Sequence, residues 1–192
     1  MIKHILTTVC NRKCPYCITR NIRTKQVIDF HLLAKNYNLL SKKEDFIMLT
    51  GGEPTMAEWF WEYVDYAKDF FLQIFLTTQN EKVLSDHRFE VFNAISFSIH
   101  DTDRILPVYL KIPIYACVMD EKYNAKLPNK LKKLGYSGLT INEEQRNGKE
   151  FTQKLPKSTK KFSIKINHKG RCINYTIILP NGEIVTDFSI YL

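Results

Sequence analysis

Short apolar runs and amphipathic segments alternate about six times over the first 145 residues of the sequence. The runs have the length and composition of buried strands, and the segments between most of them place apolar residues at helical spacing. Because parallel strands need crossover connections, this alternation predicts an α/β fold in which helices cover a parallel sheet. The expected strands are 2–9, 46–50, 73–78, 94–99, 112–119 and 138–142, and the expected helices are 29–41, 57–71, 81–93, 102–110 and 127–134.

Three of the five cysteines, Cys10, Cys14 and Cys17, lie in the loop directly after the first expected strand. Thiolates select iron–sulfur clusters, zinc or copper, and a loop this short can turn three of them toward one point. Structural zinc sites and common four-cysteine clusters use four protein ligands. The loop therefore predicts a metal centre whose remaining position is filled from elsewhere in the chain or is open to a small ligand.

Further polar features follow the other expected strands at their carboxyl ends, where α/β folds gather functional groups. Gly51-Gly52-Glu53-Pro54 follows the second strand, Thr78 ends the third, and Ser98 and His100 lie at the end of the fourth. We expect these residues to share one edge of the sheet with the cysteine loop. Glu53 also has a simpler interpretation, in which its carboxylate caps the following helix, and Asp101 is interpreted as the N-cap of the next helix.

The cysteine spacing, an aromatic Tyr16 before the third cysteine, and the Gly51-Gly52-Glu53-Pro54 turn resemble the radical S-adenosylmethionine (radical SAM) enzymes. The match spans residues 1–145 and implies a partial (β/α)6 barrel of the TIM type. It also implies that Cys10, Cys14 and Cys17 hold one [4Fe–4S] cluster, whose fourth iron binds the amino and carboxylate groups of S-adenosylmethionine.

The resemblance implies a set of cofactor-binding residues as well. The backbone of the glycine-rich turn and the Glu53 carboxylate would bind the methionine ammonium, and Tyr16 would pack beside the adenine. Ser98 is similar to a serine near the methionine carboxylate and ribose, whereas Thr78 and His100 are included for their place at the same edge. The full set is Tyr16, Gly51, Gly52, Glu53, Pro54, Thr78, Ser98 and His100; no catalytic residue is assigned.

The activity that the resemblance implies is reductive cleavage of S-adenosylmethionine to methionine and a 5′-deoxyadenosyl radical, which removes a hydrogen atom from a substrate. Such an enzyme works anaerobically and takes electrons from a donor such as flavodoxin or ferredoxin. The protein contributes placement and exclusion of water, while the cofactors supply the radical chemistry.

Residues 146–192 are expected to form a C-terminal extension and not an independent domain. It contains short strands at 162–166, 175–179 and 183–188, the last two joined by a Pro180-Asn181-Gly182 hairpin turn. Cys172 and Asp187 resemble the opening of the SPASM-type extension of peptide-modifying radical SAM enzymes, although Asp187 stands where a second cysteine belongs. A peptide or protein substrate is therefore favoured over nucleic acid, and no auxiliary cluster is expected.

Composition and charge limit the alternative functions and the localisation. The 192 residues are 44% hydrophobic and carry a net charge of +8, with no apolar run long enough to cross a membrane and no signal-peptide pattern, so we expect a cytoplasmic protein. The basic charge leaves open the modification of a nucleoside or RNA base, and the small size leaves open glycyl-radical enzyme activation. The non-enzyme alternative is a zinc-binding nucleic-acid module in which His4, His31 or His100 completes the cysteine site. Cys117 is expected to be a small buried hydrophobic residue.

Overall fold

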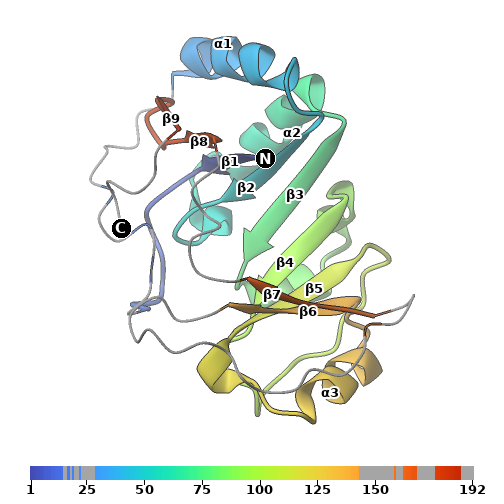
Figure 1. Ribbon diagram of the computed structural model, residues 1–192. Helices are drawn as coiled ribbons and strands as arrows, with labels where there is room; N and C mark the ends of the chain where they lie inside the picture. The colour runs from blue at the N-terminus through green and yellow to red at the C-terminus, as the bar shows by residue number, and fades with distance from the viewer. Residues whose placement is uncertain are drawn as a thin grey trace. The chain divides into compact units, whose positions relative to one another are not determined.

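The computed structural model (Figure 1) describes residues 1–14, 17, 19, 22, 29–142, 158, 162–167 and 176–186. The chain divides into two compact units. The first comprises Met1–Thr78 together with Cys172–Leu192, and the second comprises Gln79–Arg171. Each unit has its own set of paired strands and its own helices, and each is described below by itself.

The first unit has a five-stranded sheet in the order β3-β2-β1-β8-β9. Its strands are β1 (Ile2–Ile5), β2 (Phe46–Thr50), β3 (Gln73–Thr78), β8 (Thr176–Ile178) and β9 (Ile184–Val185). All neighbours pair in parallel except β8 and β9, which form an antiparallel hairpin. The helices α1 (Phe30–Ser41) and α2 (Phe60–Phe70) connect β1 to β2 and β2 to β3, as parallel pairing requires.

Local sequence explains where these helices begin and what they bury. Asp29 accepts hydrogen bonds from the backbone N–H groups of His31 and Leu32, at 3.0 and 3.1 Å, which caps the start of α1. α1 and α2 pack against each other, and α2 packs against β3. Tyr37 of α1 and Tyr63 of α2 are both buried in this helix-covered core.

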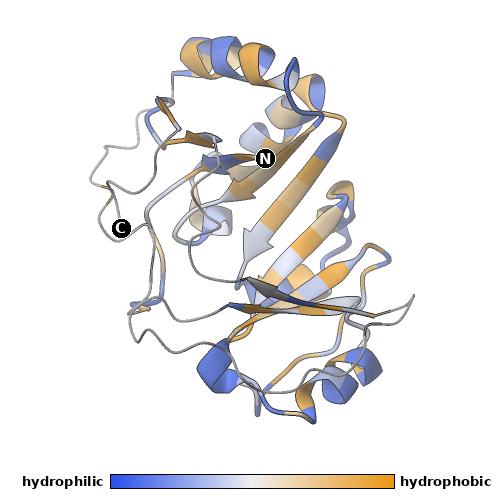
Figure 2. Cartoon of the chain, viewed as in Figure 1, coloured by the Kyte–Doolittle hydropathy of each residue, from blue (hydrophilic) through white to orange (hydrophobic). Residues whose placement is uncertain are grey.

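The second unit has a four-stranded parallel sheet in the order β4-β5-β6-β7. Its strands are β4 (Ala94–Ser98), β5 (Ile114–Met119), β6 (Gly138–Asn142) and β7 (Ser163–Asn167), and its helix α3 (Leu127–Lys133) packs on β6. Figure 2 shows hydrophobic residues along the strands. It also shows that α3 carries both hydrophilic and hydrophobic residues. Gly138 lets β6 and β7 approach, since a Cβ atom there would lie 2.5 Å from the Ser163 hydroxyl oxygen.

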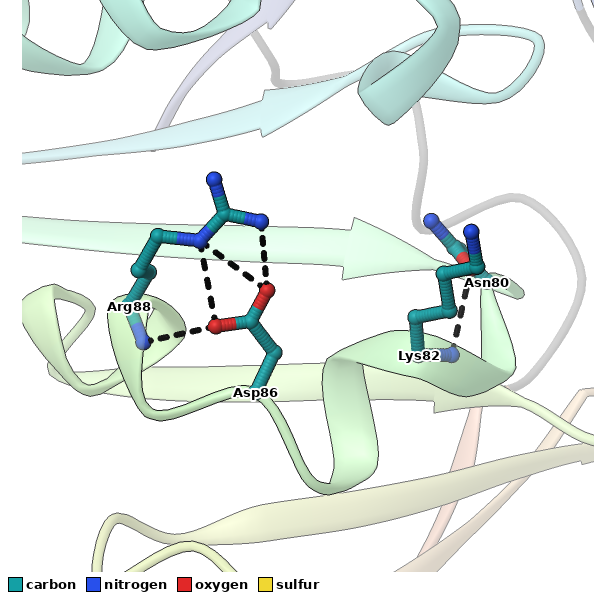
Figure 3. A network of polar contacts seen from close by, with 4 residues as sticks. All are labelled: Asn80, Lys82, Asp86 and Arg88. Atoms are coloured by element: carbon teal, nitrogen blue, oxygen red, sulfur yellow. Dashed lines mark hydrogen bonds and ion pairs between the residues drawn. The ribbon is translucent and has the colours of Figure 1, made fainter.

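The expected helix over residues 81–93 is wrong, because this stretch forms two 3-10 helices, Glu81–Leu84 and His87–Val91. Each begins at its own capping side chain. Asn80 accepts a hydrogen bond from the Lys82 N–H at 3.2 Å, and Asp86 accepts one from the Arg88 N–H at 3.0 Å (Figure 3). The Arg88 guanidinium also binds the Asp86 carboxylate, with a shortest contact of 2.7 Å. The Asp86 cap begins a second helical segment within this stretch, so one continuous α-helix does not form.

The expected short helix over residues 102–110 is also wrong, as the structure describes no helix there. Asp101 does accept the Asp103 N–H at 2.9 Å, but this closes a turn. Pro107 lacks an N–H group, and the residues after it form tertiary backbone hydrogen bonds: Val108 donates to Leu134 and Tyr109 donates to Leu84, both at 2.8 Å. Those tertiary partners replace the local ones that a helix would have used.

The parallel α/β character that the sequence predicts is confirmed in both units. Every remaining expected strand and helix is present within the described ranges, with ends shifted by a few residues. None of the helices described has the length and apolar character needed to span a membrane.

Candidate functional site

The cysteine loop is joined to the glycine-rich turn by backbone hydrogen bonds that extend the β1–β2 pairing beyond both strands. Leu6 donates to the Thr50 carbonyl, Gly52 donates to the Thr7 carbonyl, and Glu53 donates to the Val9 carbonyl, each at 2.8 Å. Val9 directly precedes Cys10. The structure therefore brings the start of the cysteine loop and the Gly51-Gly52-Glu53-Pro54 turn together at the carboxyl edge of the first unit's sheet.

The two glycines make this close approach sterically possible. A Cβ atom at position 51 would lie 2.6 Å from the Thr7 carbonyl oxygen, and one at position 52 would lie 2.7 Å from the Thr8 carbonyl oxygen and closer still to that of Val9. These are backbone atoms, so no flexible side chain can move aside. The resemblance implies that this turn receives the methionine ammonium, and the structure shows that its glycines make room for the chain's own cysteine loop.

Glu53 is a buried carboxylate whose orientation is fixed by hydroxyl and amide donors. Its side chain is 2% exposed, and Oε1 accepts hydrogen bonds from the Thr78 hydroxyl at 2.6 Å and the Thr55 hydroxyl at 2.7 Å. The Thr55 N–H donates to the same oxygen at 3.2 Å and makes Glu53 the cap of the 3-10 helix Pro54–Met56. The capping interpretation of Glu53 is thus correct, and the capping residue lies at the same sheet edge as the start of the cysteine loop.

The three cysteines of the loop are half-buried thiols outside any disulfide. The loop turns on itself, since the Cys17 N–H donates to the Cys14 carbonyl at 3.2 Å and the Arg12 N–H donates to the Cys10 sulfur at 3.4 Å. Burial raises the pKa of the Cys14 thiol, and negative charge on Cys17 and on Cys10 raises that pKa further.

The fit of this loop to a metal depends on the kind of metal. Within the described part of the chain, no three His, Cys, Asp or Glu side chains are arranged to hold a single ion. A [4Fe–4S] cluster makes a different demand, because each cysteine binds a different iron and the three sulfurs stay apart by the width of the cluster. Three half-buried thiols on one turn can each bind a different iron of such a cluster.

His4, one candidate for a fourth zinc ligand, is a core residue. Its ring is 1% exposed, lies edge-on to the rings of Tyr37 and Tyr63, and its Nδ1 is 2.6 Å from the Tyr37 hydroxyl oxygen. Burial lowers the pKa of His4 to about 3, so the imidazole is neutral. His31, a second candidate, is exposed in the first turn of α1.

Ser98 and His100 lie in the second unit, at the carboxyl end of β4. Ser98 is the register partner of Cys117 on β5, and the Ile99 N–H donates to the Cys117 carbonyl at 2.8 Å. Cys117 is half-buried, and its sulfur lies 3.0 Å from the Ser96 hydroxyl oxygen. The assignment of Ser98 and His100 to the cofactor stays a prediction. Tyr16, Cys172 and Asp187 lie outside the described residues.

Sequence reasoning missed two threonines that contact the predicted site. Thr55 binds the Glu53 carboxylate, and the hydroxyl oxygen of buried Thr19 lies 3.2 Å from the Cys17 sulfur. Each follows a predicted site residue by two positions, a spacing at which hydroxyl side chains commonly reach back along the chain. That spacing is the signal that could have identified both residues.

The fold is similar to that of a solved enzyme structure, Streptococcus suis SuiB. The chain matches crystal structures of Streptococcus suis SuiB, a radical SAM enzyme, with a TM-score of 0.68 and 9% identity for SuiB bound to S-adenosylmethionine. For SuiB bound to the precursor peptide SuiA the values are 0.66 and 11%, and for a third SuiB structure they are 0.61 and 10%. Each match covers 96% of this chain, which spans only 58% or 59% of the SuiB chain. No protein-family profile and no curated protein matches the sequence. The recognition made from the sequence is thereby confirmed at the level of the fold.

Proposed function

We propose that this protein is an enzyme that reductively cleaves S-adenosylmethionine at a [4Fe–4S] cluster and abstracts a hydrogen atom from a peptide or protein side chain. The observation that carries the proposal is the backbone hydrogen bonding that joins the cysteine loop to the Gly51-Gly52-Glu53-Pro54 turn. It brings a three-thiolate loop and a buried carboxylate to one sheet edge, as a ligand bound to both would require. When bound, the two cofactors supply a one-electron cleavage that yields a 5′-deoxyadenosyl radical.

The chain's own residues hold and orient these groups. Cys10, Cys14 and Cys17 bind three irons as thiolates and leave one iron open. The Glu53 carboxylate receives the ammonium group of S-adenosylmethionine, a charge that an acidic group complements. Thr78 holds the Glu53 carboxylate in place through a 2.6 Å hydrogen bond and is therefore a positioning residue.

We infer that the chain has a partial (β/α)6 architecture, with residues 1–145 as the core and 146–192 as an extension. Consecutive strands are neighbours in each unit, β1 to β2 to β3 and β4 to β5 to β6, which is the strand order of a barrel. The match to SuiB over 96% of the chain supports the same architecture.

The proposed substrate class rests on the SuiB structure that contains a precursor peptide. A peptide or protein is accordingly preferred over a nucleoside or RNA base, and the electron donor is a flavodoxin- or ferredoxin-like protein. Cleavage of the sulfonium needs one electron per event, so a donor of this class balances the reaction.

Anaerobic reconstitution with iron and sulfide tests the proposal. The wild-type protein is expected to bind about four irons per chain and to convert S-adenosylmethionine to 5′-deoxyadenosine in the presence of dithionite. Cys14→Ala should lose both properties, whereas Cys117→Ala, the matched control from the second unit, should keep them. Cleavage by a Cys14→Ala protein as fast as by wild type would overturn the assignment.

The substrate class is tested with the same reconstituted protein. Pools of deuterated peptides and of deuterated RNA are incubated separately, and deuterium transfer into 5′-deoxyadenosine is followed by mass spectrometry. We expect transfer from the peptide pool; transfer from RNA alone would replace the peptide assignment with nucleic-acid modification.

A further inference from the structure

The C-terminal hairpin of β8 and β9 is built into the sheet that carries the cysteine loop. β8 pairs in parallel with β1, with Ile2 opposite Thr176 and His4 opposite Ile178. Ile177 and Leu179 are buried, 3% and 0% exposed, in an apolar cluster with Ile5 of β1. The hairpin is therefore part of the core of the first unit.

The tip of the hairpin is fixed to α1. The Asn36 side-chain amide donates a 2.6 Å hydrogen bond to the Gly182 carbonyl, and Asn36 itself is buried. Gly182 has a φ of 85°, so a residue with a side chain would be strained in this turn, and its Cβ atom would lie 3.0 Å from the Leu32 side chain. The turn closes through the Gly182 N–H, which donates to the Leu179 carbonyl at 2.8 Å.

The apolar cluster also contains Ile22, which comes after the third cysteine. Ile22 is 5% exposed, and its N–H donates to the Thr19 carbonyl at 3.2 Å. Thr19 is 4% exposed, and its hydroxyl oxygen lies 3.2 Å from the Cys17 sulfur. A continuous set of contacts thus runs from the hairpin through Ile22 and Thr19 to Cys17.

We propose that the β8–β9 hairpin braces the cysteine loop and that Thr19 is the residue through which it positions Cys17. The inference rests on the proposed function, since Cys17 is taken to bind the cluster as a thiolate. A thiolate has no proton, so the Thr19 hydroxyl must be the donor in this contact. Hydrogen bonds to ligand sulfurs favour the more negatively charged cluster and are among the factors that set its potential. Thr19 would then fix the geometry of Cys17 and raise the potential of the cluster.

The role of Thr19 is tested by potentiometry of the reconstituted protein. Thr19→Val removes the hydroxyl and should shift the cluster midpoint to a more negative potential, and Thr19→Ser should restore the wild-type value. Thr102→Val, on a loop of the second unit, is the matched control and should leave the potential unchanged. An unshifted midpoint in Thr19→Val would overturn the tuning role.

The role of the hairpin is tested without iron, in cluster-free full-length protein, so that its outcome is separate from that of the proposed function. The rate of iodoacetamide alkylation at Cys17 is measured by mass spectrometry. Ile177→Ala should raise this rate roughly tenfold, because a buried isoleucine that holds Ile22 is lost. Ile141→Ala removes an equally buried isoleucine from the second unit and should leave the rate at its wild-type value.

Asn36→Ala serves as the milder second variant, since it releases the hairpin tip from α1 without opening a large cavity. It should raise alkylation at Cys17 by less than Ile177→Ala does. Equal rates at Cys17 in wild type, Ile177→Ala and Asn36→Ala would overturn the bracing role, even if the wild-type protein binds its cluster and cleaves S-adenosylmethionine.

Discussion

Acidification should destabilise this protein through His4, a buried residue of β1 whose ring packs against Tyr37 of α1 and Tyr63 of α2. The ring is 1% exposed and in hydrogen-bond contact with Tyr37, and burial lowers its pKa from 6.5 to about 3. The unfolded chain therefore binds a proton at His4 between these two values, whereas the folded chain does not. The stabilisation is fully present above pH 6.5 and is lost as the pH falls toward 3.

The magnitude follows from the pKa difference. One pKa unit corresponds to about 1.4 kcal/mol, so the full shift is worth on the order of 5 kcal/mol. Only part of this free-energy difference can be measured at pH values at which the carboxylates stay ionised. Between about pH 7.5 and about pH 5.0, we expect His4 to account for a loss of about 2 kcal/mol in the free energy of unfolding.

Urea unfolding of the cluster-free protein, followed by circular dichroism across this pH range, measures the effect. His4→Phe keeps an aromatic ring against Tyr37 and Tyr63 but cannot be protonated, so its unfolding free energy should fall by about 2 kcal/mol less than that of wild type. His4→Phe should also be less stable by about 1–3 kcal/mol at neutral pH, because the buried Tyr37 hydroxyl loses its partner.

His31→Gln is the matched control, because His31 is exposed on the same helix that His4 contacts. It should reproduce the wild-type pH dependence. If His4→Phe shows the same pH dependence as wild type, the reasoning from burial to protonation is refuted.

Three further perturbations test the site and the local structure. Gly52→Ala would place a Cβ atom 2.7 Å from the Thr8 carbonyl oxygen, and it should lower the unfolding free energy by about 1–3 kcal/mol in urea and abolish iron retention. Thr78→Val removes the 2.6 Å hydrogen bond to Glu53 and should weaken S-adenosylmethionine binding in calorimetry by about 1.5–3 kcal/mol, whereas Thr78→Ser should bind as wild type does. Asp86→Ala removes a half-buried cap and should cost about 1 kcal/mol in thermal unfolding without changing iron content. Unchanged values in any of the three would contradict the role given to that residue.

The sequence predicted the strands and the long helices correctly where local and tertiary preferences agree. The apolar run 46–50 and the run 73–78 are strands with those bounds, and α1 begins directly after its Asp29 cap. It failed over 81–93 and 102–110. In both stretches the periodicity favours a helix. In the first, Asp86 caps a new 3-10 helix. In the second, the residues after Pro107 have tertiary backbone partners that no local pattern reveals.

The candidate site divides in the same way. Cys10, Cys14 and Cys17 were predictable because their spacing within one loop is a local property, and so was the turn Gly51-Gly52-Glu53-Pro54. The contact of Thr78 with Glu53 was not, since it depends on where the backbone of β3 places a hydroxyl group, whereas the two-residue spacing of Thr55 from Glu53 is itself a local signal. The same holds for His4, which the sequence offers as a metal ligand and the packing of Tyr37 and Tyr63 makes a core residue.

By itself, the sequence determined the alternation of strands and helices, the cysteine spacing and the order of the motifs along the chain. Only the tertiary structure decided that the glycines at 51 and 52 face the backbone leading into Cys10, and that the C-terminal hairpin packs on the segment after Cys17. Spacing along a chain restricts which side chains can meet within one loop or helix. Contacts between segments far apart in sequence depend instead on strand register and on burial of apolar surface, which are properties of the whole folded chain.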